Sequence, residues 1–267
     1  MYKIVFIDID GTLMNDKKQI TKKTRDIINK LSNKGIIVVI CSGRAREYAI
    51  NISKEINFSN YIISSNGGEV FDYRNNKIIY ENEIDNDTII SLYNVVESYD
   101  ASIIMNTNNG RVTNKRTKSE CKIMENKISD FLKDNKVVQL VIVDDDLEKI
   151  QRIKKELDKY SDLKIVNASK WLYNKKVKIT KSTFIDIANK DTCKGEAVRK
   201  LCNYLNIELN KAIALGDSYN DLSMFEIVGK SVAMGNATED IKSAVNEVTL
   251  TNNNDGVATF LEKQFLK

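Results

Sequence analysis

Short apolar runs that alternate with amphipathic segments constrain the fold of this chain more than any other feature. The runs within 3–8, 35–40 and 61–64 are short and continuous, which is typical of strands buried on both faces of a parallel sheet. Between them, residues 21–34 and about 44–56 have the spacing of helices. The order strand, helix, strand, helix, strand predicts right-handed crossovers and an α/β fold, a Rossmann-like doubly wound parallel sheet.

The same alternation returns near the C-terminus. The segments there are a helix over 198–205, a strand at 212–215, a helix over 221–228, a short strand at 231–234 and a helix over 256–265. The middle of the chain differs, because it mixes two helices (88–99 and 147–157) with several short strands. We therefore expect a discontinuous core domain, residues 1–83 and 186–267, with an inserted α+β domain at 84–185.

Composition excludes several classes of function. The 267 residues include no histidine, which excludes Ser-His-Asp hydrolases, phosphohistidine enzymes and histidine-rich metal sites. Catalysis must then use carboxylates, lysine, hydroxyls, thiols or a metal. Lysine and arginine number 41 against 37 acidic residues, a net charge of +4, and the two signs are interspersed. We therefore expect no nucleic-acid partner.

Location can also be predicted from composition. The four cysteines are widely spaced and form no CxxC pair, as is typical of a reducing compartment. Asp8 and Asp10 interrupt any N-terminal signal sequence, and no apolar run approaches the ~18 residues of a membrane span. We expect a cytoplasmic protein without a membrane partner, either a monomer or a weak homodimer.

Polar residues follow the predicted strands at the points where these strands end. Because the carboxyl ends of strands line the ligand crevice of an open parallel sheet, we expect these side chains to face one site. Lys194 lies at the start of a predicted helix, within Asp191–Glu196. The strand-end residues are Asp8, Asp10, Gly11, Ser42, Gly43, Arg44, Asp217, Asn220 and Asp221.

Each of these motifs also has an ordinary structural interpretation when it is taken alone. Asp8-Ile-Asp10-Gly11 could be a turn that ends a strand, and Ser42-Gly43-Arg44 could be a helix cap. Asp217 and Asp221 could be acids at a helix N-terminus. A lysine such as Lys194 is usually exposed.

Taken together and in this order, the motifs resemble the four signature motifs of the haloacid dehalogenase superfamily of aspartate-nucleophile phosphotransferases. Further matches resemble its Cof-type phosphatases, which carry a large type IIB cap, and the insertion at about 84–185 lies where that cap belongs. Ser42 departs from the many relatives with threonine but keeps the hydroxyl. The further matches are Ser65-Asn66-Gly67-Gly68, Val232–Ala237 and Asp255–Ala258.

The resemblance implies a role for each motif. Asp8 would be the nucleophile that forms an aspartyl phosphate, and Asp10 the acid and base. Ser42, Gly43, Lys194 and Asn220 would bind the phosphate. Mg²⁺ would be held by Asp8, Asp217, Asp221 and the Asp10 backbone carbonyl. Arg44, Asn66 and Gly67 would face the substrate or the cap.

Elementary electrostatics supports these roles. A phosphate dianion repels an anionic nucleophile, so its charge must be neutralised before in-line attack. Mg²⁺ commonly binds one or two carboxylates together with substrate phosphate, which suits Asp8 and Asp217. An acid must be partly protonated, so we expect the pKa of Asp10 to lie above that of metal-bound Asp8.

The resemblance favours a Mg²⁺-dependent phosphatase acting on a small phosphomonoester, such as a sugar phosphate, flavin mononucleotide or pyridoxal phosphate. A phosphohexomutase is an alternative, but residues 84–185 contain only Arg111, Arg116 and Arg152 to grip a second phosphate. A non-catalytic sugar-phosphate sensor would lack a catalytic residue, and none is missing. A receiver domain has a different motif order. Trp171 could stack on a ligand, although packing is the favoured role.

Overall fold

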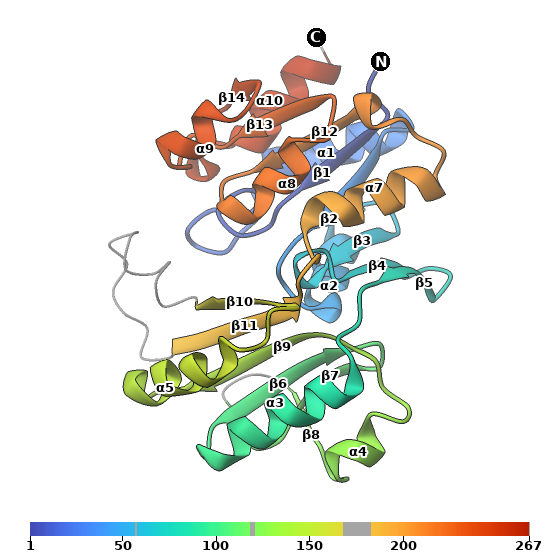
Figure 1. The fold of residues 1–267 in the computed structure, drawn as a ribbon. Helices are drawn as coiled ribbons and strands as arrows, with labels where there is room; N and C mark the ends of the chain where they lie inside the picture. Colours follow the sequence, from blue (N-terminus) through green and yellow to red (C-terminus); the bar gives the residue numbers. More distant parts are fainter. Residues whose placement is uncertain (57, 118–120, 168–182, 267) are drawn as a thin grey trace. The chain divides into compact units, whose positions relative to one another are not determined.

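The computed structural model describes residues 1–56, 58–117, 121–167 and 183–266, and the chain divides into two compact units (Figure 1). One unit joins Met1–Glu81 to Cys193–Lys267, and the other is Asn82–Thr192. The predicted boundary at residue 185 falls inside a strand, β11 (Thr183–Asn189), which pairs with β9 and β10 of the second unit. That unit therefore continues to Thr192. Trp171 lies outside the described residues.

In the described part of the first unit, eight strands form one sheet in the order β14-β13-β12-β1-β2-β3-β4-β5. The pairs from β14 to β3 are parallel, and β4 and β5 add antiparallel pairs at one edge. The predicted α/β core with a parallel sheet is confirmed. The strands are β1 (Ile4–Ile7), β2 (Ile37–Cys41), β3 (Tyr61–Ser64), β4 (Glu69–Asp72), β5 (Lys77–Glu81), β12 (Ala212–Gly216), β13 (Lys230–Ala233) and β14 (Glu247–Val248).

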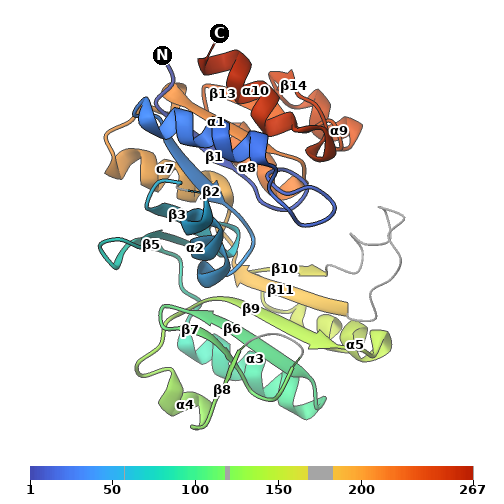
Figure 2. The same cartoon turned by 180° about the vertical axis from the view of Figure 1, so that it is seen from behind.

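Helices cover both faces of this sheet, as the two opposite views show (Figures 1 and 2). The apolar sides of α1 (Lys22–Asn33), α2 (Arg46–Glu55) and α10 (Gly256–Phe265) pack in one cluster. Those of α7 (Lys194–Tyr204), α8 (Leu222–Phe225) and α9 (Glu239–Ser243) pack in a second cluster on the other face. The 3-10 turns are η1 (Ser65–Gly67), η2 (Leu209–Lys211), η3 (Tyr219–Asp221) and η4 (Asn252–Asn254).

Local sequence explains most of these helix boundaries. Thr21 caps α1 by accepting a hydrogen bond from the Thr24 N–H, and Gly35 follows its end at φ +77°. The helix predicted over 221–228 is shorter, because the chain first makes the turn η3, which Ser218 and Asp221 close with a reciprocal capping box.

The described residues of the second unit form a six-stranded sheet in the order β10-β11-β9-β6-β7-β8. Apolar side chains of three helices pack on it in a cluster made only of residues from this unit. The predicted helices at 88–99 and 147–157 correspond to α3 and α5. The elements are α3 (Asn86–Ser98), β6 (Ser102–Thr107), β7 (Gly110–Thr113), β8 (Lys122–Ile123), α4 (Ile128–Phe131), β9 (Val137–Asp144), α5 (Leu147–Leu157), β10 (Leu163–Asn167) and β11.

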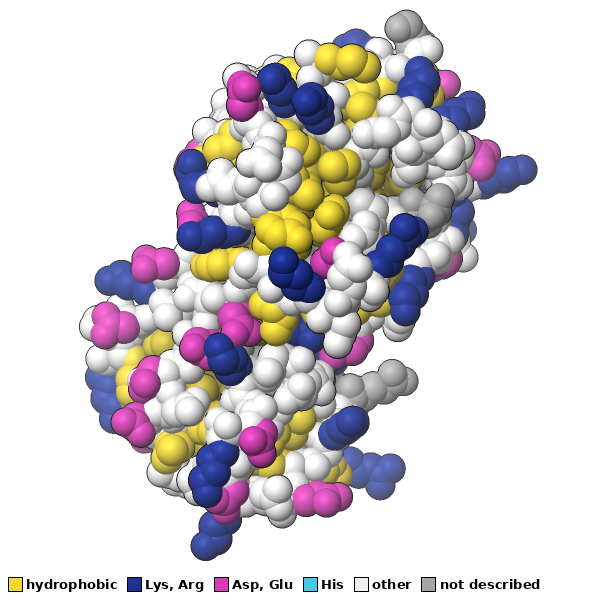
Figure 3. Space-filling view, turned by 90° about the vertical axis from the view of Figure 1, so that its right-hand side faces the viewer, with side chains coloured by type: hydrophobic (Ala, Val, Ile, Leu, Met, Phe, Trp, Pro, Cys, Tyr) yellow, Lys and Arg dark blue, Asp and Glu magenta, His cyan; other side chains and the backbone are white. Residues whose placement is uncertain are grey.

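The molecular surface carries charges of both signs. On the face drawn in Figure 3, basic and acidic side chains are interspersed. None of the described helices combines the length and the apolar character that a membrane crossing requires.

Candidate active site

The carboxyl ends of three neighbouring parallel strands bring the predicted acidic and hydroxyl residues together. β1 pairs with both β2 and β12, with Ile7 opposite Ile40 and Leu215. One or two residues further along, Asp8, Ser42 and Asp217 are all buried. The register of the sheet therefore places two carboxylates and one hydroxyl at one edge, as the sequence predicts.

Lys194 provides the positive charge at this edge. It begins α7, its side chain is 0% exposed, and its Nζ lies 2.6 Å from Oδ1 of both Asp8 and Asp221. Burial alone would lower the pKa of Lys194, but the two carboxylates outweigh burial and raise it. The buried ammonium therefore stays charged and holds both acids in place.

Three buried carboxylates meet around this ammonium. Among the described residues, Asp8, Asp217 and Asp221 each offer one oxygen, and these oxygens lie within 4.8 Å of one another. Burial and repulsion from Asp221 and Asp217 raise the pKa of Asp8 in spite of Lys194. Three acids against one ammonium, with oxygen donors only, fit a divalent hard cation such as Mg²⁺.

Hydrogen bonds orient two of these carboxylates. Thr12 Oγ1 donates to Asp217 Oδ1 at 3.3 Å, and Asn236 Nδ2 lies 3.4 Å from Asp217 Oδ2. Asp221 Oδ2 accepts the N–H groups of Asp217 and Ser218, at 2.9 Å each. Since Asp221 also binds Lys194, both of its oxygens are engaged, which favours an orienting role for it.

Gly11 lets the loop after β1 approach Asp217. It has φ +81°, and a Cβ at this position would lie 2.5 Å from Asp217 Oδ2. A larger residue would therefore push Asp217 away from the other carboxylates, and it would also strain the backbone.

The end of β2 forms a second polar group with η1 and η3. Ser42 Oγ accepts the N–H of Arg44 at 3.2 Å, and the Ser42 carbonyl accepts the N–H of Asn66 at 3.1 Å. Asn66 Oδ1 in turn accepts a hydrogen bond from Asn220 Nδ2 at 3.0 Å. A Cβ on Gly43 would lie 2.7 Å from that same oxygen, so a larger residue here would displace the Asn66 side chain.

Gly67, the last residue of η1, lies against the residue that precedes α7. At φ +95°, it approaches so closely that a Cβ would lie 2.2 Å from the Cys193 carbonyl oxygen. Ser65 and Asn66 before it also have positive φ, of 52° and 57°. This strained turn places Asn66 beside Ser42 and packs against the residue that precedes Lys194.

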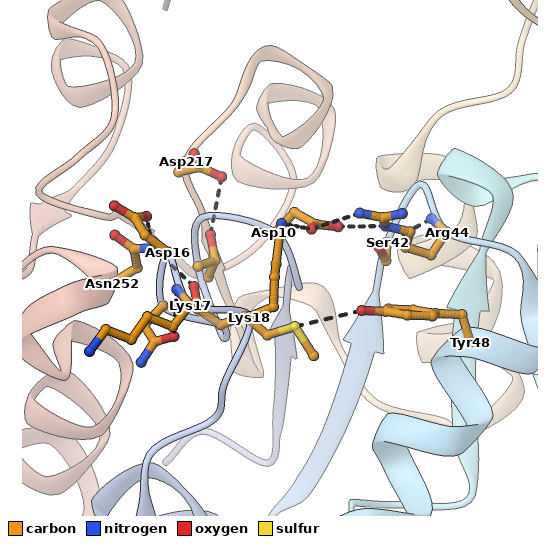
Figure 4. A network of polar contacts seen from close by, with 12 residues as sticks. Asp10, Asp16, Lys17, Lys18, Ser42, Arg44, Tyr48, Asp217 and Asn252 are labelled. Atoms are coloured by element: carbon orange, nitrogen blue, oxygen red, sulfur yellow. Dashed lines mark hydrogen bonds and ion pairs between the residues drawn. The ribbon is translucent and has the colours of Figure 1, made fainter. Parts of the chain in front are cut away.

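Asp10 lies apart from the three-carboxylate cluster, and cations bind both of its oxygens (Figure 4). Arg44 donates from Nε to Oδ2 at 2.7 Å and from Nη2 to Oδ1 at 2.9 Å, and Lys18 Nζ lies 2.6 Å from Oδ1. Partial burial would raise the pKa of Asp10, but the hydrogen bonds and charges of Arg44 and Lys18 lower it to about 2.

The protein's own groups raise the pKa of Asp8 and lower that of Asp10. The predicted order concerns Asp8 with a metal ion bound, and it stays a prediction. The prediction considered only the catalytic task of Asp10 and did not include its two cationic neighbours. Lys18 itself was missed, because the Asp16-Lys17-Lys18 run has the pattern of an exposed turn. Thr12 directly follows the Asp8-Ile-Asp10-Gly11 motif and Asn236 lies within Val232–Ala237, but no role was predicted for either.

Comparison with known proteins identifies the family. Residues 5–261 match the family model of haloacid dehalogenase-like hydrolases. Phosphatase YwpJ of Bacillus subtilis is 28% identical and aligns over 97% of this chain and 99% of its own length. The 5-amino-6-(5-phospho-D-ribitylamino)uracil phosphatase YcsE of the same organism is also 28% identical, over 96% of this chain and 93% of its own length.

Solved structures agree with this assignment. A haloacid dehalogenase-like hydrolase from Bacteroides thetaiotaomicron superimposes with a TM-score of 0.84, at 29% identity, over 99% of this chain and 100% of its own. A sugar phosphatase of subclass IIB shares the fold, with a TM-score of 0.76 at 20% identity and 98% coverage of both chains. The chain therefore belongs to the haloacid dehalogenase-like hydrolases, and it shares the fold of their subclass IIB phosphatases.

Proposed function

We propose that this enzyme hydrolyses small phosphomonoesters, with Mg²⁺ as cofactor and an aspartyl phosphate on Asp8 as the intermediate. The observation that carries the proposal is the buried contact between Asp8, Lys194 and Asp221, next to Asp217. It provides a nucleophilic carboxylate, a fixed positive charge for a phosphoryl oxygen and an oxygen-lined place for a divalent cation.

The two oxygens of Asp8 have different tasks in this mechanism. Oδ1 is bound to Lys194, so we assign the attack on phosphorus to Oδ2. The bond between Oδ2 and phosphorus forms while the bond to the leaving alkoxide breaks. Lys194, the Ser42 hydroxyl, the backbone at Gly43 and the Asn220 amide are the groups we assign to the phosphoryl oxygens.

A divalent cation held by Asp8 and Asp217, with the Asp10 carbonyl and Asp221 in support, would neutralise charge on the phosphoryl group. Asp217 is kept in place for this purpose by Thr12 and Asn236. Carboxylate and carbonyl oxygens are the donors that Mg²⁺ prefers over softer ligands.

Asp10 moves protons in both half-reactions. It donates a proton to the leaving oxygen, and it then removes one from the water that attacks the phosphoaspartate. Such acid–base catalysis contributes about 10²–10⁴-fold in rate. Because Arg44 and Lys18 occupy both Asp10 oxygens, at least one of these contacts must be released when the substrate binds.

The substrate class is supported by the relatives. One relative is named as a phosphatase of a phosphoribityl compound. This supports a phosphorylated sugar, sugar alcohol or flavin mononucleotide, with pyridoxal phosphate as a further candidate of the same size. Arg44, Asn66 and Gly67 are the core-unit residues that we assign to the substrate side, and the unit Asn82–Thr192 is the proposed cap.

Initial rates of phosphate release from a panel of phosphomonoesters test the proposal. We expect turnover with Mg²⁺, loss of turnover with EDTA, and no turnover by Asp8→Asn. Inactivity of the wild type on the whole panel with Mg²⁺ present would refute the phosphatase assignment. Activity of Asp8→Asn at the wild-type rate would refute the nucleophile.

The metal assignment has an independent test in thermal unfolding. A ligand that binds only the folded state at 100 times its dissociation constant stabilises it by about 2.7 kcal/mol. We expect Mg²⁺ to raise the melting temperature of the wild type and to raise that of Asp217→Asn much less. Equal shifts for both proteins would place the cation elsewhere.

A further inference from the structure

We propose that Lys18 is a positioning residue, whose ammonium group holds Asp10 in the orientation that serves the leaving oxygen. The inference rests on the proposed function, because it concerns the acid–base step of that reaction. Lys18 belongs to none of the motifs that define the site, and its part in the site follows from its contact with Asp10.

The two cations on Asp10 differ in what else they can bind. Arg44 directly follows Ser42 and Gly43, and its own N–H donates to the Ser42 hydroxyl. A phosphoryl group held by Ser42 would therefore compete with Asp10 for the Arg44 guanidinium, which binds phosphate oxygens in a bidentate manner. Lys18 reaches Asp10 from a different loop, so it can keep Oδ1 when the Arg44 guanidinium leaves both Asp10 oxygens.

The loop that carries Lys18 is built to hold this side chain. Lys18 has φ +58°, which is unfavourable for a residue other than glycine. Asn15 closes the turn around it, since its Oδ1 accepts the N–H groups of Lys17 and Gln19 and its carbonyl accepts that of Lys18.

A second set of contacts fixes this turn to the C-terminal part of the core unit. Asp16 accepts hydrogen bonds from Asn252 at 3.1 Å and from Asn253 at 2.9 Å, and its N–H donates to Asn253 Oδ1. Figure 4 shows Lys18 directed to Asp10, whereas Lys17 points away from it. The neighbouring lysine is therefore a natural control.

Two substrates with different leaving groups can show whether Lys18 acts by positioning the acid Asp10 or in some other way. An alkyl leaving group, as in a sugar phosphate, needs a proton from Asp10, whereas p-nitrophenolate leaves without one. We expect Lys18→Gln to lower kcat/KM about tenfold for a sugar phosphate, a fraction of what a general acid contributes. The lost orientation should outweigh the rise in the pKa of Asp10 that removal of this cation brings. For p-nitrophenyl phosphate the loss should stay below about twofold, because acid catalysis contributes little there.

Two further variants complete the experiment. Lys18→Arg keeps a cation near Oδ1 and should restore most of the lost rate, and Lys17→Gln should match the wild type on both substrates. The three variants should share the wild-type melting temperature, since both lysine side chains are exposed. Equal losses on the two substrates, or a Lys18→Gln enzyme that behaves as Lys17→Gln does, would overturn the positioning role. Failure of the proposed function is distinct, because the wild type would then hydrolyse neither substrate.

Discussion

At the scale of single residues, Lys194 connects the stability of the core unit to its chemistry. A fully buried ammonium is tolerated because two carboxylates contact it, and those carboxylates are buried in turn because the ammonium is there. The same contacts orient Asp8 for attack in the proposed reaction. One substitution should therefore affect both folding and turnover.

We predict that Lys194→Met lowers the free energy of unfolding by about 3–5 kcal/mol, because it leaves buried carboxylates without their counter-charge. Phosphate release should be lost at the same time. Lys200→Met, on the same helix, removes an exposed lysine that lies 3.3 Å from Glu196 and should cost less than about 1 kcal/mol. Urea unfolding at neutral pH measures both, and equal stability of the two variants would contradict the prediction.

Site residues could be predicted from the sequence where their position depends only on a strand end. Asp8 and Asp217 follow buried apolar runs directly, so the sheet register alone brings them together. Lys18 could not be predicted in this way. Its contact with Asp10 depends on a left-handed turn and on anchors near the other end of the chain, and neither leaves a periodic pattern in the sequence.

At the scale of elements, two glycines allow a test of how closely the turn after β1 must approach the three buried carboxylates. Gly11 and Gly35 both have positive φ, but a Cβ on Gly35 would meet nothing within 4 Å. We predict that alanine at either position costs about 1 kcal/mol of stability, because both backbones are left-handed.

Only Gly11→Ala should also impair catalysis, on the order of 10²-fold, because it displaces Asp217 from its place beside Asp8. Unfolding by urea and phosphate release at saturating Mg²⁺ measure the two effects separately. Equal activity of Gly11→Ala and Gly35→Ala would show that the close approach to Asp217 is unimportant.

The β14 edge of the sheet provides a prediction about pH. Glu247 lies 2.8 Å from Lys230 of β13 and 2.8 Å from Lys263 of α10, and hydrogen bonds from these lysines lower its pKa below the ordinary 4.5. A lowered pKa in the folded state means stability that is present above 4.5 and is lost as the pH falls through the folded value.

Glu247→Gln should therefore be less stable than the wild type near neutral pH, by less than about 1 kcal/mol because the pair is partly exposed. The difference should shrink as the pH falls below 4.5. Glu239→Gln, which alters an exposed glutamate near Lys242, is the control. A difference that stays constant with pH would contradict the assignment.

Elements could be predicted where apolar residues repeat with helical spacing over a long continuous segment. α1, α5 and α10 lie close to their predicted ranges for this reason. β4 was missed because its sequence, Glu69-Val-Phe-Asp72, begins and ends with acids and yet is buried. Glu69 forms an ion pair with Arg46 of α2, and the Arg46 guanidinium also packs on the Phe71 ring. A sequence pattern of neighbouring residues cannot predict this partner, because Arg46 lies on a different element.

At the scale of the whole molecule, the chain leaves the core unit after β5 and returns directly at the site. Cys193 is the first core residue after the return; it caps α7 and touches the Gly67 turn, and Lys194 follows it. The hydrophobic clusters of the described residues follow the same division into two units. Two clusters contain only core-unit residues, and the third contains only residues between Ile84 and Ile187.

This division predicts that residues 82–192 fold when expressed alone, because the apolar core of their described part includes no side chain from the other unit. The fragment should give dispersed amide signals in NMR and a cooperative urea transition. It should release no phosphate from any ester, since the residues assigned to phosphoryl transfer all lie outside it.

Two truncations within this fragment show whether the transition reports on the described core. Leu140→Ala removes a fully buried side chain and should cost about 2–5 kcal/mol. Ile123→Ala removes a side chain from a residue that is 51% exposed and should cost less than about 0.5 kcal/mol. A fragment that stays unfolded, or one in which both truncations shift the midpoint equally, would mean that the second unit depends on the core unit for its stability. The two units would then have to fold together, and changes in residues 82–192 would affect Lys194 and its carboxylates through stability as well as through the proposed role in substrate binding.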